Sequence, residues 1–293
     1  MRVGFFPNWS KKTIVPVIKE MMASCRKRNI EVLIADSEEA RFYNEELGLP
    51  QDMFISIPQI FADIDIAFSL GGDGTFIELA RKIVSYNIPI CGINLGELGF
   101  LNQIELDEID QRLKMIINGQ CRVEERIYLQ AFIRTPKGNQ PLVPIINEVV
   151  ITREEPAKMA RINLAINEGH TQMYPADGLI ISTSTGSTGY NLSAGGPILA
   201  PDNRSIIVTP IAPHLLQGVS LVLKESARID ISMPKRQTHL HICVDGTFDY
   251  DFTNEDSLHI EVGSAHCKQI RFPDKKFFAS LFKKLGARRD EIL

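Results

Sequence analysis

The chain has no long apolar run, no marked excess of either charge and no paired-cysteine motif. No segment approaches the roughly 18 apolar residues that a membrane-spanning helix needs. The 32 Lys and Arg against 36 Asp and Glu give a formal net charge of -4, which argues against a general nucleic-acid binder. The opening MRVGFFPNWS predicts a strand and lacks the features of a secretory signal peptide. We therefore expect neither a nucleic-acid partner nor a membrane partner.

The five cysteines are odd in number and widely scattered, with no CxxC pair among them. This usage is typical of reduced packing residues and predicts a cytoplasmic location. The composition, 44% hydrophobic and 23% charged, is that of an ordinary globular protein. A length of 293 residues is sufficient for two domains, each with a buried core.

Two common nucleotide motifs, the Walker A loop and the GxGxxG fingerprint, are also missing from the most informative segment of the chain. Residues 65–75 run DIAFSLGGDGT, an apolar strand that ends in the turn Gly71–Thr75. Glycines let backbone N–H groups approach an anion closely, and the helical pattern of Phe76–Tyr86 follows at once. Asp73 would repel a phosphate unless it holds a cation or accepts a proton. An isolated GGDG sequence would be only a tight turn with a helix cap.

The first part of the chain alternates strands and helices. The expected strands are Val3–Phe6, Glu31–Ala35, Ile64–Leu70 and Pro89–Ile93, and the expected helices are Lys12–Arg28, Phe76–Tyr86 and Leu106–Ile117. This alternation predicts a parallel sheet that is covered by helices on both faces. Ligands bind at the carboxyl ends of such strands, where Gly71–Thr75 falls.

After Gly119 the pattern changes to short strands separated by turn residues. The expected strands are Val123–Arg134, Leu142–Thr152, Arg161–Asn167, Leu179–Ser182, Ile206–Pro210, Ser220–Leu223, Arg228–Met233, His239–Val244 and Leu258–Val262. We therefore predict an α/β domain over residues 1–120 and a β-rich domain over residues 121–272. Residues 273–293 predict a C-terminal helix that packs back on the first domain, a membrane-surface helix being the alternative.

Asn147 and Glu148 lie between two apolar runs, Val143–Ile146 and Val149–Ile151. The pair could be a solvent-facing part of a strand. It is also well suited to a purine edge or to ribose hydroxyls, because the amide both donates and accepts while the carboxylate offers two acceptor oxygens.

A dense set of hydroxyls and glycines follows the strand Leu179–Ser182. Residues 177–199 run DGLIISTSTGSTGYNLSAGGPIL. A flexible polar loop is one interpretation. The apolar flanks and the aromatic Tyr190 favour an ordered loop that binds phosphate or ribose oxygens.

With GGDGT, NE and DGLIISTSTGSTGYNLSAGGPIL in this order, the chain closely resembles the NAD kinases. Residues 89–102, PICGINLGELGFLN, add a further family-like segment. The resemblance implies a two-domain enzyme that phosphorylates the 2′-hydroxyl of the adenosine ribose of NAD. It also implies ATP as the phosphoryl donor, a divalent cation such as Mg²⁺, and a homodimer or homotetramer.

The resemblance also implies roles for individual residues. Asp73 would accept the proton of the ribose hydroxyl, Gly74 would shape the nucleotide pocket, and Asn147, Glu148 and Asp177 would contact NAD. The loop residues that match the family's nucleotide contacts are Thr185, Thr188, Gly189, Tyr190, Asn191, Leu192 and Ser193, with Lys158 and Thr247 as further contacts in less distinctive surroundings. No residue is assigned as a metal ligand.

The chain departs from the family pattern at two positions. Many members have a basic residue where this chain has Pro175, and alanine is common where it has Gly189. Candidates for the missing charge are Arg153, Lys158 and Arg161. Two alternatives remain: a lipid kinase of the diacylglycerol or sphingosine type, which shares the GGDGT turn, and a nucleotide-binding regulator without activity. Asp73 is intact, so the sequence gives no support for a loss of catalytic activity.

Overall fold

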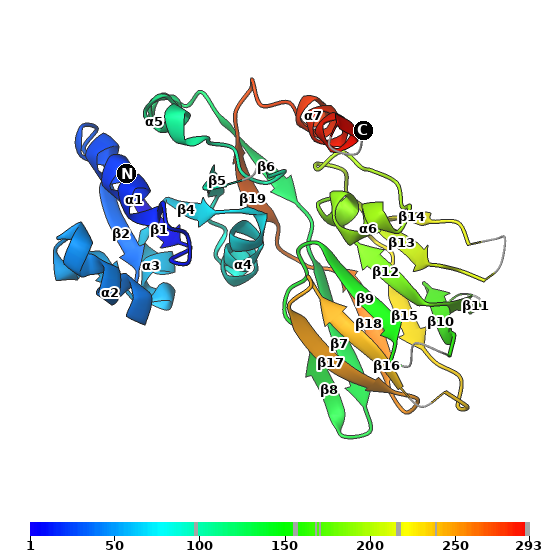
Figure 1. The fold of residues 1–293 in the computed structure, drawn as a ribbon. Helices are drawn as coiled ribbons and strands as arrows, with labels where there is room; N and C mark the ends of the chain where they lie inside the picture. Colours follow the sequence, from blue (N-terminus) through cyan, green and yellow to red (C-terminus); the bar gives the residue numbers. More distant parts are fainter. Residues whose placement is uncertain are drawn as a thin grey trace. The chain divides into compact units, whose positions relative to one another are not determined.

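The computed structural model describes residues 1–96, 99–154, 158–167, 169, 171–214, 218–237 and 239–290, with side chains to residue 286. The chain forms two compact units (Figure 1). Met1–Glu125 and Cys267–Leu293 make up unit 1, and Arg126–His266 make up unit 2. The boundary that the sequence suggested, at residues 120/121, lies close to the one in the structure. Cys267–Phe272, however, group with unit 1 rather than with the β-rich part.

Unit 1 is built on a seven-stranded sheet with the order β3-β2-β1-β4-β5-β19-β6. Its strands are β1 (Arg2–Pro7), β2 (Glu31–Ala35), β3 (Phe54–Ile55), β4 (Ile66–Gly71), β5 (Ile90–Asn94), β6 (Arg122–Arg126) and β19 (Cys267–Arg271). The pairs formed among β1 to β5, and the pair of β19 with β5, are parallel. The predicted parallel sheet is confirmed.

The helices of unit 1 cover both faces of this sheet. They are α1 (Ile14–Arg26), α2 (Glu38–Leu47), α3 (Ile57–Asp63), α4 (Asp73–Ile83) and α5 (Ile109–Ile117), with 3-10 turns at Gln51–Met53, Val84–Tyr86 and Leu106–Glu108. The unit also contains α7 (Phe277–Asp290). Phe5 and Phe68 join the core beneath α1 and α5. Phe6 points the other way and packs on Phe61 of α3, with ring centroids 5.5 Å apart. Alternate strand residues therefore supply two cores.

Several elements of unit 1 differ from the sequence expectation. Between residues 38 and 63 the structure has α2, β3 and α3, where the sequence predicted no element. Helix α4 begins at Asp73 instead of Phe76, so the aspartate is in the first helical turn rather than in the turn before it. β19 was not predicted. It joins the sheet beside β5 by parallel pairing. The two strands are far apart in the sequence, so no local sequence pattern predicts this pairing.

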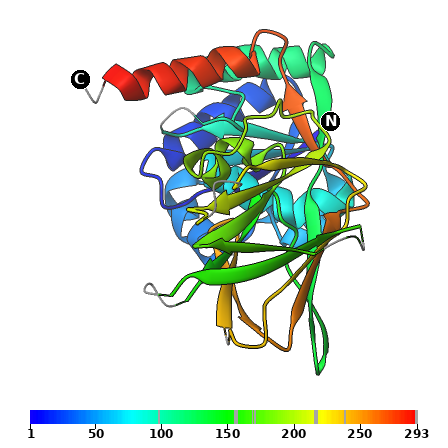
Figure 2. The same cartoon turned by 90° about the vertical axis from the view of Figure 1, so that its right-hand side faces the viewer.

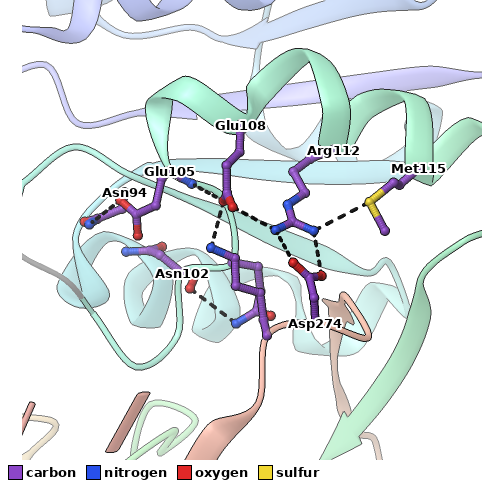
Figure 3. Close-up of polar contacts among 9 residues, drawn as sticks. Asn94, Asn102, Glu105, Glu108, Arg112, Met115 and Asp274 are labelled. Carbon is purple, nitrogen blue, oxygen red and sulfur yellow. Dashed lines mark hydrogen bonds and ion pairs between the residues drawn. The ribbon is translucent and has the colours of Figure 1, made fainter. Parts of the chain in front are cut away.

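An ionic network around the buried Arg112 ties the segment before α7 to α5 (Figure 3). The Arg112 guanidinium, 2% exposed, donates to both carboxylate oxygens of Asp274 at 2.7 Å and to Glu108 at 2.8 Å. It also lies 4.7 Å from the ring centroid of Phe272. The Arg112 guanidinium holds the pKa of the Asp274 carboxyl below its usual value. The segment that leads into α7 is thus fastened to unit 1.

Helix α7 runs to the C-terminal end of the described chain (Figure 2). Its Phe277 ring lies 6.4 Å from the ring of Phe100, and the Lys284 ammonium lies 3.9 Å from the same ring. Among the described residues, no helix combines the length and the apolarity needed to cross a membrane.

Unit 2 contains two six-stranded antiparallel sheets, with the orders β11-β10-β15-β18-β7-β8 and β14-β13-β12-β9-β16-β17. The first is built from β7 (Leu129–Thr135), β8 (Gly138–Pro141), β10 (Ala160–Ile166), β11 (Gln172–Ala176), β15 (Ile229–Ser232) and β18 (Ser257–Val262). The second is built from β9 (Glu148–Arg153), β12 (Gly178–Ser182), β13 (Ser205–Ile211), β14 (Leu221–Lys224), β16 (His239–Val244) and β17 (Phe248–Thr253). The predicted β-rich fold is confirmed.

Both sheets contribute alternate apolar residues to one core, in which Ile151, Ile181 and Ile133 are fully buried. Two predicted strands were too long. Val123–Arg134 divides into β6 and β7, and Leu142–Thr152 begins only at Glu148. A 3-10 turn (Gly186–Thr188) and the short helix α6 (Tyr190–Ser193) follow β12.

Candidate active site

Asp73 is the first residue of α4, two positions after the end of β4. Its Oδ2 accepts a hydrogen bond from the backbone N–H of Phe100 at 2.8 Å, and its Oδ1 accepts one from Leu101 at 3.1 Å. The side chain is half-buried. Because each oxygen has a backbone donor, the plane of the carboxylate is fixed, and a negative group is favoured at a helix N-terminus.

The segment that holds Asp73 requires a glycine and an amide. A Cβ on Gly99 would lie 2.0 Å from Asp73 Oδ1, so no other residue fits there without displacing the carboxylate. Asn102 Nδ2 donates to the carbonyl of Gly71 at 3.2 Å and so supports the turn from behind. Neither Gly99 nor Asn102 was predicted from the sequence as a site residue. The glycines of GELGFLN were the available signal.

The turn after β4 is also joined to the end of β1. Asn8 Nδ2 donates to Thr75 Oγ1 at 3.1 Å, and the Asn8 N–H donates to the Leu70 carbonyl at 2.9 Å. A Cβ on Gly74, by contrast, would have no atom within 4 Å. Gly74 is exposed, so the N-terminus of α4 is open to a ligand.

In unit 2, strand register brings three loops to one edge of the second sheet. Glu148 pairs with Ser182 at the end of β12, and Val149 pairs with Val244 at the end of β16. The Asn147–Glu148 pair, the loop after β12 and the turn after β16 therefore converge. The sequence had singled out the first two.

Asp245 orders this edge through its hydrogen bonds, and it was not predicted from the sequence as a site residue. Its carboxylate accepts hydrogen bonds from the N–H groups of Ile146 at 3.0 Å, Asn147 at 2.8 Å and Glu148 at 3.0 Å. Asp245 and Gly246 have φ values of +47° and +66°, as expected for an Asp-Gly hairpin turn. The Asp-Gly pair between two strands was the signal for the turn, but not for what the carboxylate binds.

Glu148 and Asn147 each bury a polar atom that has no hydrogen-bond partner within the described part of the chain, namely Glu148 Oε2 and Asn147 Oδ1. Glu148 is 7% exposed, and burial, with a smaller contribution from Asp245, raises the pKa of its carboxyl to about 8. A Cβ on Gly189 would lie 3.1 Å from Glu148 Oε2 and 3.8 Å from Asn147 Nδ2. Buried polar atoms are normally paired, so this arrangement is suited to a ligand that supplies the missing partners.

The loop after β12 is ordered by hydrogen bonds within unit 2. Thr183 donates from its N–H to the Asn147 carbonyl at 2.8 Å and from Oγ1 to the Ile146 carbonyl at 2.7 Å. Asn191 is fully buried, and its Nδ2 donates to the carbonyls of Ser187 and Pro197 while its Oδ1 accepts from Thr209. The Asn191 side chain therefore braces the loop from inside.

The other loop residues differ in exposure. Thr185 is buried and accepts a long hydrogen bond of 3.5 Å from Arg126, while Thr188 donates to the Thr185 carbonyl at 3.5 Å. Leu192 is half-buried, Ser193 is exposed, and Tyr190 is 43% exposed. The aromatic ring that favoured a ligand loop is thus accessible.

Asp177 pairs with Arg153 at 3.1 Å, with both side chains partly exposed. Arg161 pairs with Pro175 in the register of β10 and β11, so the two side chains share a sheet face. Lys158 and Thr247 are exposed. Thr247 Oγ1 donates to the carbonyl of Asp245 at 3.2 Å, which places it at the same edge as Glu148.

Two family models match the chain: the ATP-NAD kinase N-terminal domain over residues 4–121 and the ATP-NAD kinase C-terminal domain over residues 146–272. The chain belongs to the NAD kinase family. The NAD kinase of a Thermoanaerobacter species is 33% identical over 289 residues, which covers 98% of this chain and 99% of the relative. The NAD kinase of Heliobacterium modesticaldum is 36% identical over 222 residues, covering 76% and 78% of the two chains.

Solved structures share this fold. Yeast NADH kinase complexed with NADH superimposes with a TM-score of 0.86 at 21% identity, over 98% of this chain and 87% of that one. The NAD kinase of Archaeoglobus fulgidus in complex with ATP superimposes with a TM-score of 0.74 at 25% identity, over 97% and 98% of the two chains. These relatives do not favour the lipid-kinase alternative.

Proposed function

We propose that this chain transfers the γ-phosphoryl group of ATP to the 2′-hydroxyl of the adenosine ribose of NAD. In this reaction the hydroxyl oxygen forms a bond to the γ-phosphorus, the bond from that phosphorus to the bridging oxygen breaks, and ADP leaves. The hydroxyl proton passes to the carboxylate of Asp73. Asn147, Glu148, Asp177 and the loop after β12 bind NAD, with Lys158 and Thr247 as further contacts.

The observation that carries this proposal is the fixed carboxylate of Asp73 in a chain of this family. Its two oxygens are oriented by the N–H groups of Phe100 and Leu101, and each oxygen retains a second lone pair for a hydroxyl. A ribose hydroxyl is a weak nucleophile at neutral pH. A positioned base therefore accelerates its attack, and phosphoryl transfer depends mainly on positioning and charge neutralisation.

A divalent cation is the group that offsets the phosphate charge. Mg²⁺ takes oxygen ligands and is usually held by one or two protein oxygens together with substrate phosphates. The Asp73 carboxylate, in the first turn of α4, is the kind of oxygen ligand that would hold such a cation. Within the described residues, no group of three or more His, Cys, Asp and Glu side chains forms a metal site. When bound, the cation would supply charge neutralisation and orientation of the phosphates.

The test is the identity of the product. Purified protein is incubated with ATP, Mg²⁺ and either NAD or diacylglycerol, and the products are analysed by mass spectrometry. We expect NAD to gain one phosphoryl group and diacylglycerol to remain unchanged. A phosphorylated lipid, or no phosphorylated NAD, would contradict the proposal.

We also propose that the protein is a cytoplasmic homodimer or homotetramer. The two sheets of unit 2 end in the edge strands β8, β11, β14 and β17, and self-association is one way to cover such edges. Light scattering at micromolar concentration tests the oligomer. A mass near that of one 32.9 kDa chain, with full activity, would contradict it.

A further inference from the structure

The sheet of unit 1 has a topological switch point next to the turn that carries Asp73. From β1 the chain continues to β2 on one side of the sheet, whereas β4 lies on the other side of β1. In open α/β sheets, ligands bind outside the carboxyl ends of the strands at such a point. The loops that follow β1 and β4 meet there, and the hydrogen bond from Asn8 to Thr75 joins them.

A pocket of about 940 Å³ opens at this place, within unit 1. It is lined by the end of β1 and the following Asn8–Ser10, by the end of β2, by α2, by the start of α3 and by one face of α4 from Thr75 to Lys82. Thr75 is one of the lining residues and stands two positions after Asp73. The pocket therefore reaches the N-terminus of α4. Neither the sequence motifs nor the relatives' names give this pocket a role.

Aromatic side chains gather on one part of the pocket wall. The rings of Trp9 and Tyr43 are stacked, with centroids 5.4 Å apart and an interplanar angle of 10°. Phe42 contacts Tyr43 edge-on and is itself 71% exposed. Large exposed rings at the rim of a pocket are typical of sites that hold a flat, partly apolar ring such as a purine.

Asp36 follows directly after β2 and also lines the pocket. A carboxylate at the end of the second strand of a doubly wound sheet is well placed to accept hydrogen bonds from ribose hydroxyls. Its hydrogen bond with the Arg41 guanidinium, at 2.9 Å, keeps it oriented and holds its pKa below the usual value. The carboxylate is therefore a charged acceptor at neutral pH.

The charge of the pocket decides which end of a nucleotide it can take. Its charged lining residues are the acidic Asp36, Glu38, Glu39 and Glu78 and the basic Lys82. Lys82 is paired with Glu78 at 2.7 Å and Asp36 with Arg41, which leaves the negative charges of Glu38 and Glu39. This excess of negative charge disfavours phosphate groups. Phosphates are favoured instead at the other end, where Gly72 is the N-cap of α4 and the exposed Gly74 is in its first turn.

We propose that this pocket binds the adenosine of the phosphoryl donor, with the base against Trp9 and Phe42 and the ribose at Asp36. The triphosphate then runs past Thr75 to the N-terminus of α4, which brings the γ-phosphoryl group to Asp73. This inference rests on the proposed function, because it assigns the donor site for that reaction.

The experiment uses Trp9, which is the single tryptophan of the chain. Its fluorescence is recorded while the full-length protein is titrated with ATP, with adenosine, or with sodium tripolyphosphate. We expect a saturable change in Trp9 emission with ATP and adenosine, and none with tripolyphosphate. A change with tripolyphosphate alone, or no change with saturating ATP, would overturn the assignment.

A pair of variants gives a second measurement. Phe42→Ala removes an exposed ring, so the fold is retained, and the lost stacking is expected to raise the Kd and the KM for ATP by about tenfold. The KM for NAD should stay unchanged. The matched control is Phe282→Ala, which removes a ring that is 68% exposed on α7 of the same unit. We expect this control to leave both KM values as they are.

The two proposals can fail separately. If the protein makes phosphorylated NAD but Phe42→Ala leaves the Kd and the KM for ATP unchanged, the donor pocket is wrong and the proposed function stands. If ATP changes Trp9 emission and Phe42→Ala weakens ATP binding but no phosphorylated NAD forms, the pocket stands and the proposed function is wrong.

Discussion

Asp73 in unit 1 and Glu148 in unit 2 are both carboxyl groups at the ends of buried strands, yet their surroundings are opposite. Both oxygens of Asp73 accept backbone hydrogen bonds, and the side chain is half-exposed. Glu148 is buried, its Oε2 has no partner in the described chain, and its pKa is raised to about 8. The protein itself orients the first group. The second is left with hydrogen-bonding capacity that a ligand can use.

In unit 1 the carboxylate of Asp73 both binds backbone N–H groups and faces the expected ligand. In unit 2 these two roles belong to different residues. Asp245 accepts the three backbone N–H groups of Ile146, Asn147 and Glu148, and it does not need to contact a ligand to do so. Glu148 and Asn147 face the space beside Gly189. We infer that unit 1 presents a fixed proton acceptor, while unit 2 presents a binding surface on a rigid support.

The largest effect is expected from Asp73→Asn. The amide cannot accept a proton at neutral pH, so kcat should fall by about 10²–10⁴ while the Kd for NAD changes much less. Steady-state kinetics and calorimetric titration with NAD measure the two quantities. Asn102→Ala is the control. It removes the hydrogen bond to the Gly71 carbonyl and so loosens the turn, but the chain keeps the Asp73 carboxylate as a proton acceptor. Near-normal turnover by a folded Asp73→Asn variant would remove the base assignment.

Asp245→Ala is expected to have the next largest effect, on stability as well as on binding. Three backbone N–H groups lose a charged acceptor, so the free energy of unfolding should fall by about 2–4 kcal/mol and the KM for NAD should rise. Thermal unfolding measures the loss. The matched control is Asp251→Ala, which removes an exposed carboxylate from the adjacent strand β17. Equal unfolding temperatures for the two variants would show that the hydrogen bonds to Asp245 do not stabilise the fold.

These two predictions also mark the limit of sequence reasoning. The strand–turn–helix at Gly71–Thr75 was predictable because its pattern is local. The hydrogen bond from Phe100 to Asp73 spans 27 residues, and that from Asn147 to Asp245 spans 98. Backbone donors carry no residue signature. The partners of a carboxylate therefore cannot be read from the chain when they are main-chain N–H groups from another element.

The loop after β12 and the strand β19 illustrate the same limit. Hydroxyl and amide residues predicted a ligand loop, but composition does not separate Asn191, whose side chain faces inward, from Tyr190, which is exposed. β19 belongs to unit 1 through parallel pairing with β5, far away in the sequence. Parallel strands are not joined by a hairpin, so no turn motif in the sequence predicts their pairing.

Asn147→Ala and Asp177→Ala test whether these residues of unit 2 bind NAD. Alanine at Asn147 removes a buried, unpaired acceptor, and the KM for NAD should rise by the equivalent of roughly 1–3 kcal/mol. Asp177 is partly exposed and paired with Arg153, so its replacement should raise the KM less. Kinetics with each substrate varied in turn measure both effects. If the KM for ATP rises and the KM for NAD stays unchanged, the assignment of these residues to NAD binding is wrong.

Glu148→Gln tests the buried carboxyl through pH. The folded protein keeps the Glu148 proton up to about pH 8, whereas the carboxyl of the unfolded chain, with its ordinary pKa of 4.5, releases it earlier. The wild type therefore loses stability as the pH rises from the ordinary value towards 8. Glutamine does not ionise, so the variant should gain about 1–3 kcal/mol relative to wild type across this interval. Unfolding at several pH values measures the difference, and a difference that does not change with pH would contradict the assignment.

Gly189→Ala should have the smallest effect. Its Cβ would approach Glu148 Oε2 at 3.1 Å and the Gly186 carbonyl at 3.2 Å. A shift of a few tenths of an ångström relieves the contact, so the Kd for NAD should change by less than about threefold. Gly189→Val places two further carbons beside Glu148 and Asn147, where the ligand is expected, and should weaken NAD binding by more than about tenfold. Titration with NAD compares the two variants at matched unfolding temperature. Equal affinities for wild type and Gly189→Val would mean that NAD does not occupy the space next to Glu148.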